Sequence, residues 1–216
     1  MKQAPAFDLT PELMLAAYAR GVFPMAESRA STELHWIEPR QRGIFDLHTF
    51  HLSRSLCRRI RAVPYVVSVD RDFMGVVKAC ADRPETWINT PLLTAYEALH
   101  QMGRAHSLEV WEGDTLVGGV YGLTIGQAFM GESMFSRRTD GSKIALAYLV
   151  DRLRRAGFRL FDTQFLTPHL ASLGAIEIPK ADYKCRLAEA IQGEADFSLP
   201  NIPTPQELIQ AIAQTS

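Results

Sequence analysis

Two polar side chains end the otherwise apolar segment FRLFDTQ, and they are the first candidates for catalysis. Asp162 and Gln164 are two residues apart, so they point to the same side if the chain stays extended. A carboxylate behind a carboxamide can form a relay, in which the amide contacts a substrate and the carboxylate polarises the amide. The alternative is that Asp162 only caps the turn after the strand.

A third candidate is Glu132, which lies in the segment FMGESMFSR. Strand alternation places Met130, Glu132 and Met134 on one face. Gly131 indicates a β-bulge, which would bring Phe129 to the side of Glu132 and Met134 and form a pocket with an apolar wall and an acidic rim. Because burying an unpaired charge is costly, the alternative is an exposed edge strand with a hydrated carboxylate.

A basic stripe and a loop tryptophan are candidates for nucleic-acid contact. Arg54, Arg58, Arg59 and Arg61 follow helical spacing in the segment SRSLCRRIR, which contains no acidic residue. Such a stripe suits phosphates, and the alternative is a solvated helix face. Trp87 follows RPET in an expected loop, where it is either a base-stacking platform or a core residue.

Other chemistries find little support in the sequence. His48 and His51 are three residues apart but lack a third or fourth metal ligand, so we expect no metal site. No nucleophile elbow supports a Ser–His–Asp triad. The glycine-rich segment GGVYGLTIG opens no helix and therefore does not predict a phosphate-binding loop.

Composition limits the class of protein. The chain has 216 residues, of which 47% are hydrophobic, enough to bury a core. The net charge of −1 means that any nucleic-acid or membrane binding needs a local patch. Three scattered cysteines without a CxxC indicate a reducing compartment. With no apolar leader and no run of roughly 20 apolar residues, we expect a cytoplasmic protein without a membrane span.

The expected order of elements predicts an α/β fold. Three successive strands, at 106–112, 115–124 and 127–135, predict an antiparallel meander. A helix, a strand, a short helix and a last strand follow, which indicates an acetyltransferase-like (GNAT-like) mixed sheet with flanking helices. We expect three parts: a small N-terminal domain at 1–40, a catalytic domain at 41–199, and a Pro-rich tail with a short helix at 200–216.

Several motifs occur in the order found in one enzyme family: GVFPM, HLSRSL, ETWI, HSLEVW, LVGGVYGL, FMGESMFSR, GSKIAL and FDTQFLTPHLASLGAIEIP. From about Thr10 to Tyr183 the chain resembles the leucyl/phenylalanyl-tRNA–protein transferases. The resemblance implies transfer of Leu or Phe, and less well Met, from aminoacyl-tRNA to an N-terminal Arg or Lys of a protein, which marks that protein for N-end-rule degradation. The ester is already activated, so the reaction is expected to need no cofactor.

The resemblance also implies site residues by position. Asp162 and Gln164 match the catalytic pair, and Glu132 matches the acidic residue of the pocket. The remaining matches are an acyl pocket of Val120, Phe129, Met134, Leu146 and Phe161, contacts to the aminoacyl-tRNA 3′ end from Tyr18, Trp87 and Tyr96, and a tRNA surface of Arg54, Arg58, Arg59 and Arg61.

Two departures from the family pattern and two other functions stand beside this hypothesis. Met25 replaces a tryptophan that some members carry, and Thr163 replaces a cysteine and is expected to face away from the site. An acyl-CoA N-acetyltransferase would need a pyrophosphate loop, for which RRAGFR is a poor match. A non-catalytic tRNA-binding module would need the arginines but not DTQ. As partners we expect aminoacyl-tRNA and proteins with N-terminal Arg or Lys, bound by a monomer.

Overall fold

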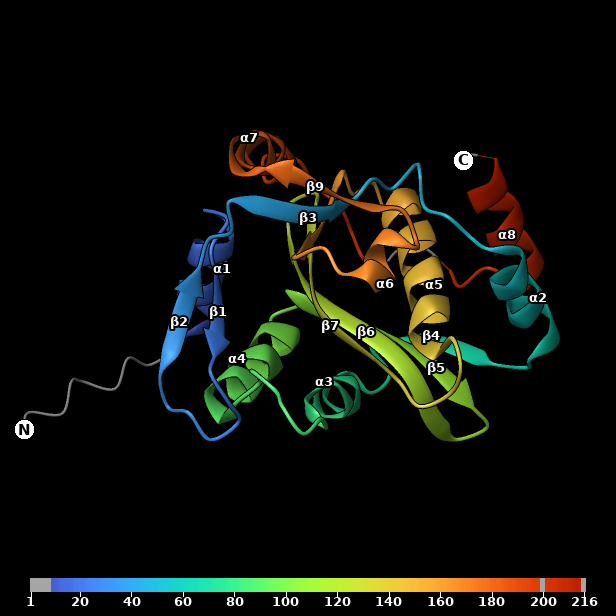
Figure 1. The fold of residues 1–216 in the computed structure, drawn as a ribbon, viewed down its shortest axis with the longest axis horizontal. Coiled ribbons are helices and arrows are strands. Elements are labelled where there is room, and N and C mark those ends of the chain that lie inside the picture. The colour runs from blue at the N-terminus through green and yellow to red at the C-terminus, as the bar shows by residue number, and fades with distance from the viewer. Residues whose placement is uncertain (1–8, 199–200, 215–216) are drawn as a thin grey trace, which may run out of the picture.

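The computed structural model describes residues 9–198 and 201–214, which form two sheets and eight flanking helices (Figure 1). The helices are α1 (Pro11–Tyr18), α2 (Arg54–Ala62), α3 (Phe73–Ala81), α4 (Thr90–Gln101), α5 (Gly141–Arg155), α6 (Pro168–Ala171), α7 (Lys180–Ala190) and α8 (Pro205–Ala213). The strands are β1 (Phe23–Ala26), β2 (Leu34–Ile37), β3 (Gln41–Phe45), β4 (Val66–Val69), β5 (Ala105–Glu112), β6 (Thr115–Ile125), β7 (Ala128–Ser136), β8 (Leu160–Gln164) and β9 (Ala175–Pro179).

The main sheet has seven strands in the order β4-β5-β6-β7-β8-β3-β9. The pair β7–β8 is parallel, and the other five pairs are antiparallel. The crossover between β7 and β8 is α5, because a parallel connection needs a long return segment. The expected meander and the α/β class with a mixed sheet and flanking helices are confirmed.

Helices cover the main sheet on both faces, which explains why its central strands carry apolar side chains on both sides. On one face, residues of α1, α3, α4 and α7 form a core cluster with side chains from β5, β6 and β7. On the other face, α2, α5 and α8 share a second cluster with the same strands. Figure 1 shows α5 lying across the sheet, with α2 and α8 beyond it at the right-hand end.

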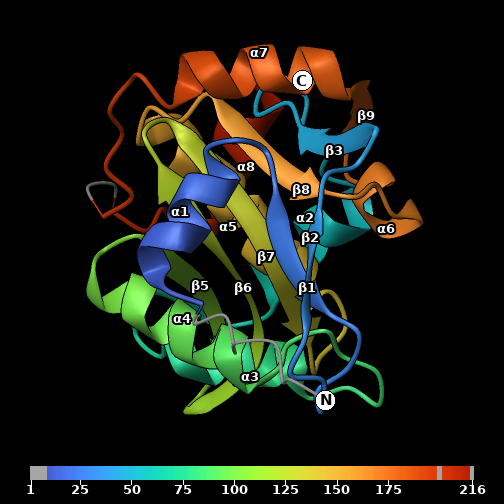
Figure 2. The same cartoon turned by 90° about the vertical axis from the view of Figure 1, so that its left-hand side faces the viewer.

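The N-terminal segment shares the main core. Thr10 accepts the Leu13 N–H and starts α1, and Met14, Tyr18 and Phe23 belong to the cluster that α3 and α4 complete. Figure 2 shows α1 and the β1–β2 hairpin on the side of the molecule that carries β7 and β8. The proposed boundaries at 40 and 199 stay a prediction, and residues 199 and 200 lie outside the described part of the chain.

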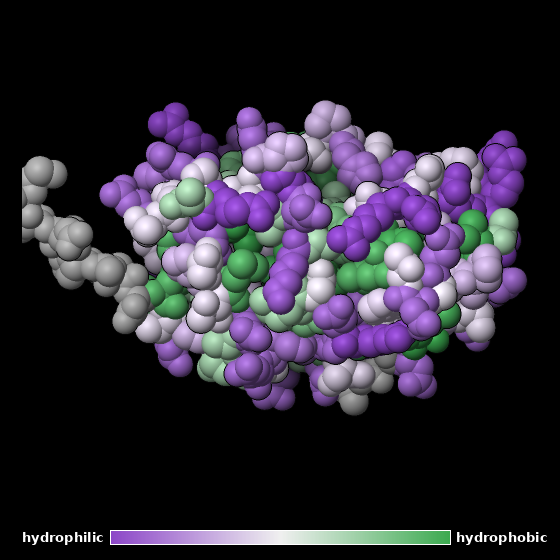
Figure 3. Space-filling view, turned by 90° about the horizontal axis from the view of Figure 1, so that it is seen from below, coloured by the Kyte–Doolittle hydropathy of each residue, from purple (hydrophilic) through white to green (hydrophobic). Residues whose placement is uncertain are grey.

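The surface is mixed in polarity. On the face seen in Figure 3, hydrophobic residues reach the surface in separate patches among hydrophilic ones. In the described ranges, 9–198 and 201–214, there is no helix with both the length and the hydropathy that crossing a membrane requires.

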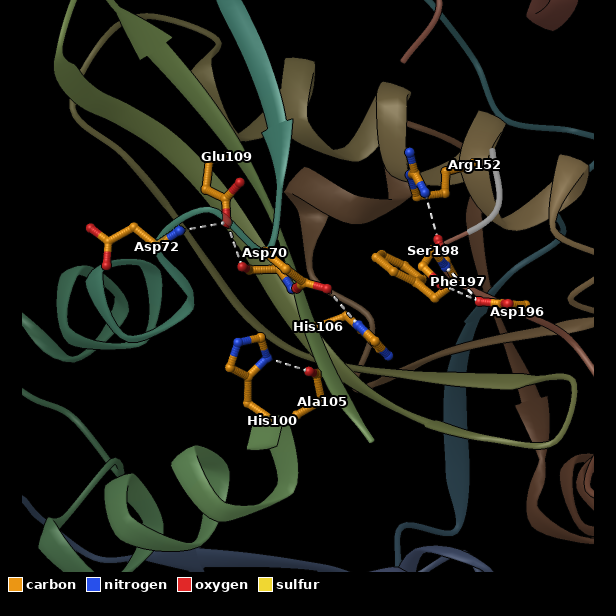
Figure 4. Close-up of polar contacts among 11 residues, drawn as sticks. Asp70, Asp72, His100, Ala105, His106, Glu109, Arg152, Asp196, Phe197 and Ser198 are labelled. Carbon is orange, nitrogen blue, oxygen red and sulfur yellow. Dashed lines mark hydrogen bonds and ion pairs between the residues drawn. The ribbon is translucent and has the colours of Figure 1, made fainter. Parts of the chain in front are cut away.

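The turn between β4 and α3 holds two aspartates with different roles, and α3 begins at Phe73. Asp72 caps the helix by accepting the Gly75 N–H. Asp70 has a φ of 54° and instead binds β5, where it pairs with His106 at 2.7 Å and accepts the Ser107 N–H (Figure 4). A carboxylate that bonds to a neighbouring strand is not available to cap the helix.

Candidate active site

The two parallel strands at the centre of the sheet separate after a short pairing. β7 and β8 pair from Ala128 to Met130 and from Leu160 to Asp162. Beyond that point β7 bulges at Glu132, which has no direct partner in β6, and β8 ends at Gln164 with a φ of 65°. A cavity of about 270 Å³ opens where the strands diverge, lined by residues of both.

The bulge places the side chains of β7. The predicted irregularity is confirmed, and Phe129 and Met134 pack on the same core cluster. Met130 lies in the opposite cluster. The expectation that Met130 shares a face with Met134 is therefore wrong, because one extra residue inverts strand alternation.

Glu132 is a buried carboxylate with three hydrogen-bond donors. Its Oε1 accepts from the Tyr18 hydroxyl at 2.6 Å and from Gln164 Nε2 at 3.0 Å, and its Oε2 accepts from the Tyr96 hydroxyl at 2.6 Å. Burial raises the pKa of Glu132 to about 7, although the tyrosine hydroxyls oppose that rise. Because β7 lies inside the sheet and the Glu132 side chain lines the cavity, the exposed-edge alternative is excluded.

Tyr18 and Tyr96 do not line the cavity. Both are fully buried, and their hydroxyls end on Glu132. Their side chains reach the cavity only through Glu132, and their contact with the RNA terminus stays a prediction. Trp87 does line the cavity, from the expected loop before α4.

Asp162 is fully buried and carries a direct counter-charge. Arg42 Nε donates to its Oδ1 at 2.8 Å, and Arg42 Nη2 donates to its Oδ2 at 2.6 Å. The Tyr183 hydroxyl donates to Oδ2 at 2.7 Å. The guanidinium lies between two rings, 4.7 Å from the Phe23 centroid and 4.5 Å from that of Tyr183. This bidentate, stacked geometry is the one that arginine forms best.

Sequence reasoning missed Arg42 and Tyr183. Arg42 lies 120 residues from Asp162, and β3 reaches β8 only through sheet pairing. The available signal was an arginine directly before the buried segment GIF, since a charged side chain in a buried strand needs a partner.

The predicted relay named the wrong carboxylate: the side chain of Gln164 does not bond to Asp162. Gln164 adopts a left-handed backbone conformation, so the chain is not extended there and its side chain turns away from Asp162. Asp162 Oδ1 accepts the backbone N–H of Gln164 at 2.8 Å, as the capping alternative predicted. The carboxylate behind the amide is Glu132, which accepts from Nε2.

Most of the expected acyl pocket forms one wall of the cavity, made by Val120, Met134, Leu146 and Phe161. Phe129 does not line it, and stands behind Phe161 with the ring centroids 5.4 Å apart. Thr163 lines the cavity, contrary to the expectation that it faces away. Met25, from β1, lines it as well.

The basic stripe lies apart from the cavity. Arg54, Arg58 and Arg61 are exposed on α2, and none of the four arginines lines the cavity. Arg59 pairs with Asp140 at 2.9 Å. An acidic residue distant in the sequence thus offsets one of the four charges.

Comparison with known proteins gives the family. The model of leucyl/phenylalanyl-tRNA protein transferase matches residues 44–188, and the model of its N-terminal domain matches residues 7–40. The chain belongs to the leucyl/phenylalanyl-tRNA–protein transferase family. A family member from Cereibacter sphaeroides is 64% identical over 96% of this chain and 98% of its own length. Another, from Ruegeria pomeroyi, is 60% identical over 97% of this chain and 100% of its own.

Similarity of this family member to solved structures is distant. The alignment with the structure of FemX covers 93% of this chain and 70% of the FemX chain. The two are 14% identical, and the TM-score is 0.47. At that distance the comparison carries nothing about the site, which stands on its own geometry.

Proposed function

We propose that this protein transfers Leu or Phe, and less well Met, from aminoacyl-tRNA to an N-terminal Arg or Lys of proteins, and thereby marks them for N-end-rule degradation. The observation that supports this most is the cavity between β7 and β8. It combines an apolar wall with a polar pair, Glu132 and Gln164, at one place. Family membership supports the same reaction.

The apolar wall fits a side chain of medium size. Val120, Leu146 and Phe161 present only carbon atoms, and Met134 is flexible enough to adapt to a branched or a flat group. One methylene changes binding by about 1–3 kcal/mol, so such a pocket accepts Leu and Phe together. Charged side chains are rejected because they would lose their hydration without a partner.

The transfer step needs little beyond positioning. The α-amine of the acceptor attacks the ester carbonyl, a C–N bond forms, the C–O bond breaks, and the ribose oxygen leaves with a proton. An α-amine has a pKa of about 7.7–8.0, so roughly a tenth is neutral at pH 7. Holding amine and ester together supplies much of the acceleration.

Gln164 is placed to orient the amine. Its Nε2 donates to Glu132, which leaves the carboxamide oxygen Oε1 as the acceptor for an N–H of the attacking amine. When Glu132 is ionised it strengthens this polarisation, and its charge favours an approaching cationic N-terminus. Asp162 accepts the backbone N–H of Gln164 and does not line the cavity.

A direct assay tests the function. Labelled Phe-tRNA incubated with an Arg-initiated peptide should give labelled peptide, and an Ala-initiated peptide should give far less. Acetyl transfer from acetyl-CoA in place of this activity would favour the acetyltransferase alternative. Binding of tRNA without any transfer would favour the non-catalytic module.

A further inference from the structure

A second cavity adjoins the active-site cavity and has no part in the transfer step described above. It has a volume of about 550 Å³ and shares Arg83 and Met134 with the first. Its other walls come from the end of α3, the end of β7, the first turn of α5, and α6. We call it the anion cavity, because two arginines line it, Arg83 and Arg137, against one acidic residue, Asp82.

Arg83 stands at the junction of the two cavities in a fixed orientation. Its Nη2 donates to the Met134 carbonyl and, at 3.3 Å, to Ser133 Oγ. A guanidinium has five N–H donors, and these hydrogen bonds use one nitrogen. The rest of the planar fork matches the spacing of two phosphate oxygens.

His169, from α6, adds an observation independent of charge. Its Nε2 is buried and has no hydrogen-bond partner in the part of the chain that the structure describes. Burial and the neighbouring Lys143 lower the pKa of His169. A buried polar atom at a cavity wall gains stability from a ligand that bonds to it.

We propose that the anion cavity binds the phosphate on the 5′ side of the terminal nucleoside of aminoacyl-tRNA. This deepens, and rests on, the proposed transfer function. Only one ribose separates that phosphate from the ester, so a tRNA end with its amino acid in the first cavity brings the phosphate to Arg83. The contact between this phosphate and the anion cavity holds the tRNA end in place and thereby positions the ester. An acceptor peptide with a cationic N-terminus is disfavoured in the anion cavity by both arginines.

The experiment uses a non-transferable analogue, 3′-(phenylalanylamino)-3′-deoxyadenosine, with and without a 5′-phosphate. Each competes with Phe-tRNA in the transfer assay, and the two inhibition constants are compared. We expect the phosphate to tighten binding about tenfold or more, as a charge-assisted contact does. An equal inhibition constant for the two analogues in a wild-type enzyme that transfers Phe overturns this proposal and leaves the proposed function intact.

Variants locate the phosphate. Arg137→Gln and His169→Phe should each reduce the gain from the phosphate to threefold or less, with little change for the unphosphorylated analogue. Asp82→Asn should increase the gain, because it removes the acidic group. Arg138→Gln is the matched control, since this neighbour does not line the cavity and pairs with Glu112 at 3.0 Å.

The competing occupant is an acceptor peptide. If Arg137→Gln and His169→Phe change the KM of the Arg-initiated peptide and leave the phosphate gain intact, the cavity takes the acceptor and the proposal is wrong. If Arg138→Gln lowers the gain as much as Arg137→Gln, the effect is general surface charge and the proposal is also wrong.

Discussion

Two buried carboxylates lie within reach of Gln164, and their surroundings differ. Asp162, on β8, faces a guanidinium, a hydroxyl and a backbone N–H. Glu132, on β7, faces two hydroxyls and an amide, and no cation bonds to it among the described residues. Two carboxylates thus lie in one site with different hydrogen-bond partners.

The difference assigns them different tasks. A carboxylate that accepts two hydrogen bonds from an arginine in direct contact is held in place, which suits a residue that binds the backbone of Gln164. Glu132 has no cation in contact in the described part of the chain, and burial raises its pKa to about 7 against the hydrogen bonds that it accepts, so it gains or loses its proton near neutral pH. The proton equilibrium beside Gln164 therefore depends on Glu132 of β7, and the position of the Gln164 backbone depends on Asp162 of β8.

Removing the cation on the β8 side should have the largest effect. Arg42→Met leaves Asp162 buried without its counter-charge, and breaking a buried pair in this way costs about 3–5 kcal/mol in the free energy of unfolding. Urea denaturation measures the loss. The double variant Arg42→Met with Asp162→Asn should recover most of it. No recovery would show that the stacked rings of Phe23 and Tyr183, not the charge, depend on Arg42.

Shortening the amide should have the next largest effect. Gln164→Asn keeps a residue that tolerates the left-handed backbone but draws the carboxamide away from Glu132. We expect kcat for Phe transfer to fall roughly a hundredfold, as when a group that orients a reactant is displaced, with an unchanged melting temperature. The matched control is Gln101→Asn, the same change at the exposed last residue of α4, which does not line the cavity. Turnover above a tenth of wild type in Gln164→Asn would contradict the assignment.

The sequence predicted the elements and the family well, and the contacts within the site less well. The strand meander and the bulge follow from strand patterning and from Gly131, both local signals. The partner of Gln164 could not be predicted, because one backbone angle at Gln164 moved its side chain from Asp162 to Glu132. Arg42 was missed because pairing between β3 and β8 connects residues far apart in the chain.

A smaller effect is expected at the pocket wall. Met134→Ala enlarges the cavity at its apolar wall, so kcat/KM should shift several-fold toward Phe over Leu. Transfer assays with both aminoacyl-tRNAs measure the ratio, with Arg- and Ala-initiated peptides as acceptors.

Glu132→Gln should do the reverse, lowering transfer to Arg peptides more than it changes the Leu to Phe ratio. If Met134→Ala and Glu132→Gln change acyl preference and acceptor preference in the same way, the two residues do not have separate roles.

The smallest effect is expected on α2. Replacing Arg54 and Arg58 by Gln should weaken all tRNAs alike and lower the slope of log K against log salt by roughly two charge contacts. Arg59→Gln is the internal control, since Asp140 already offsets that charge and its change in slope should be smaller. Selective loss of one tRNA sequence would show base recognition instead.

The ionisation of Glu132 also has a defined effect on stability. Its folded-state pKa of about 7 lies above its ordinary value of 4.5, so between these values the folded state holds a proton that the unfolded state releases. The wild-type protein therefore loses stability as the pH rises through that range. Glu132→Gln cannot ionise and should gain stability relative to wild type from pH 5 to pH 8.

The most direct test is a pH titration of the side-chain carboxyl carbon of Glu132 by NMR. Protein labelled with ¹³C-glutamate supplies the signal, and its absence from Glu132→Gln assigns it. The account predicts a titration midpoint of about 7 in the wild-type protein. In Tyr96→Lys, which introduces a cation beside Glu132, the midpoint should be lower. A midpoint near 4.5 in the wild-type protein would show that the donors around Glu132 outweigh its burial, and would contradict the division of tasks between β7 and β8.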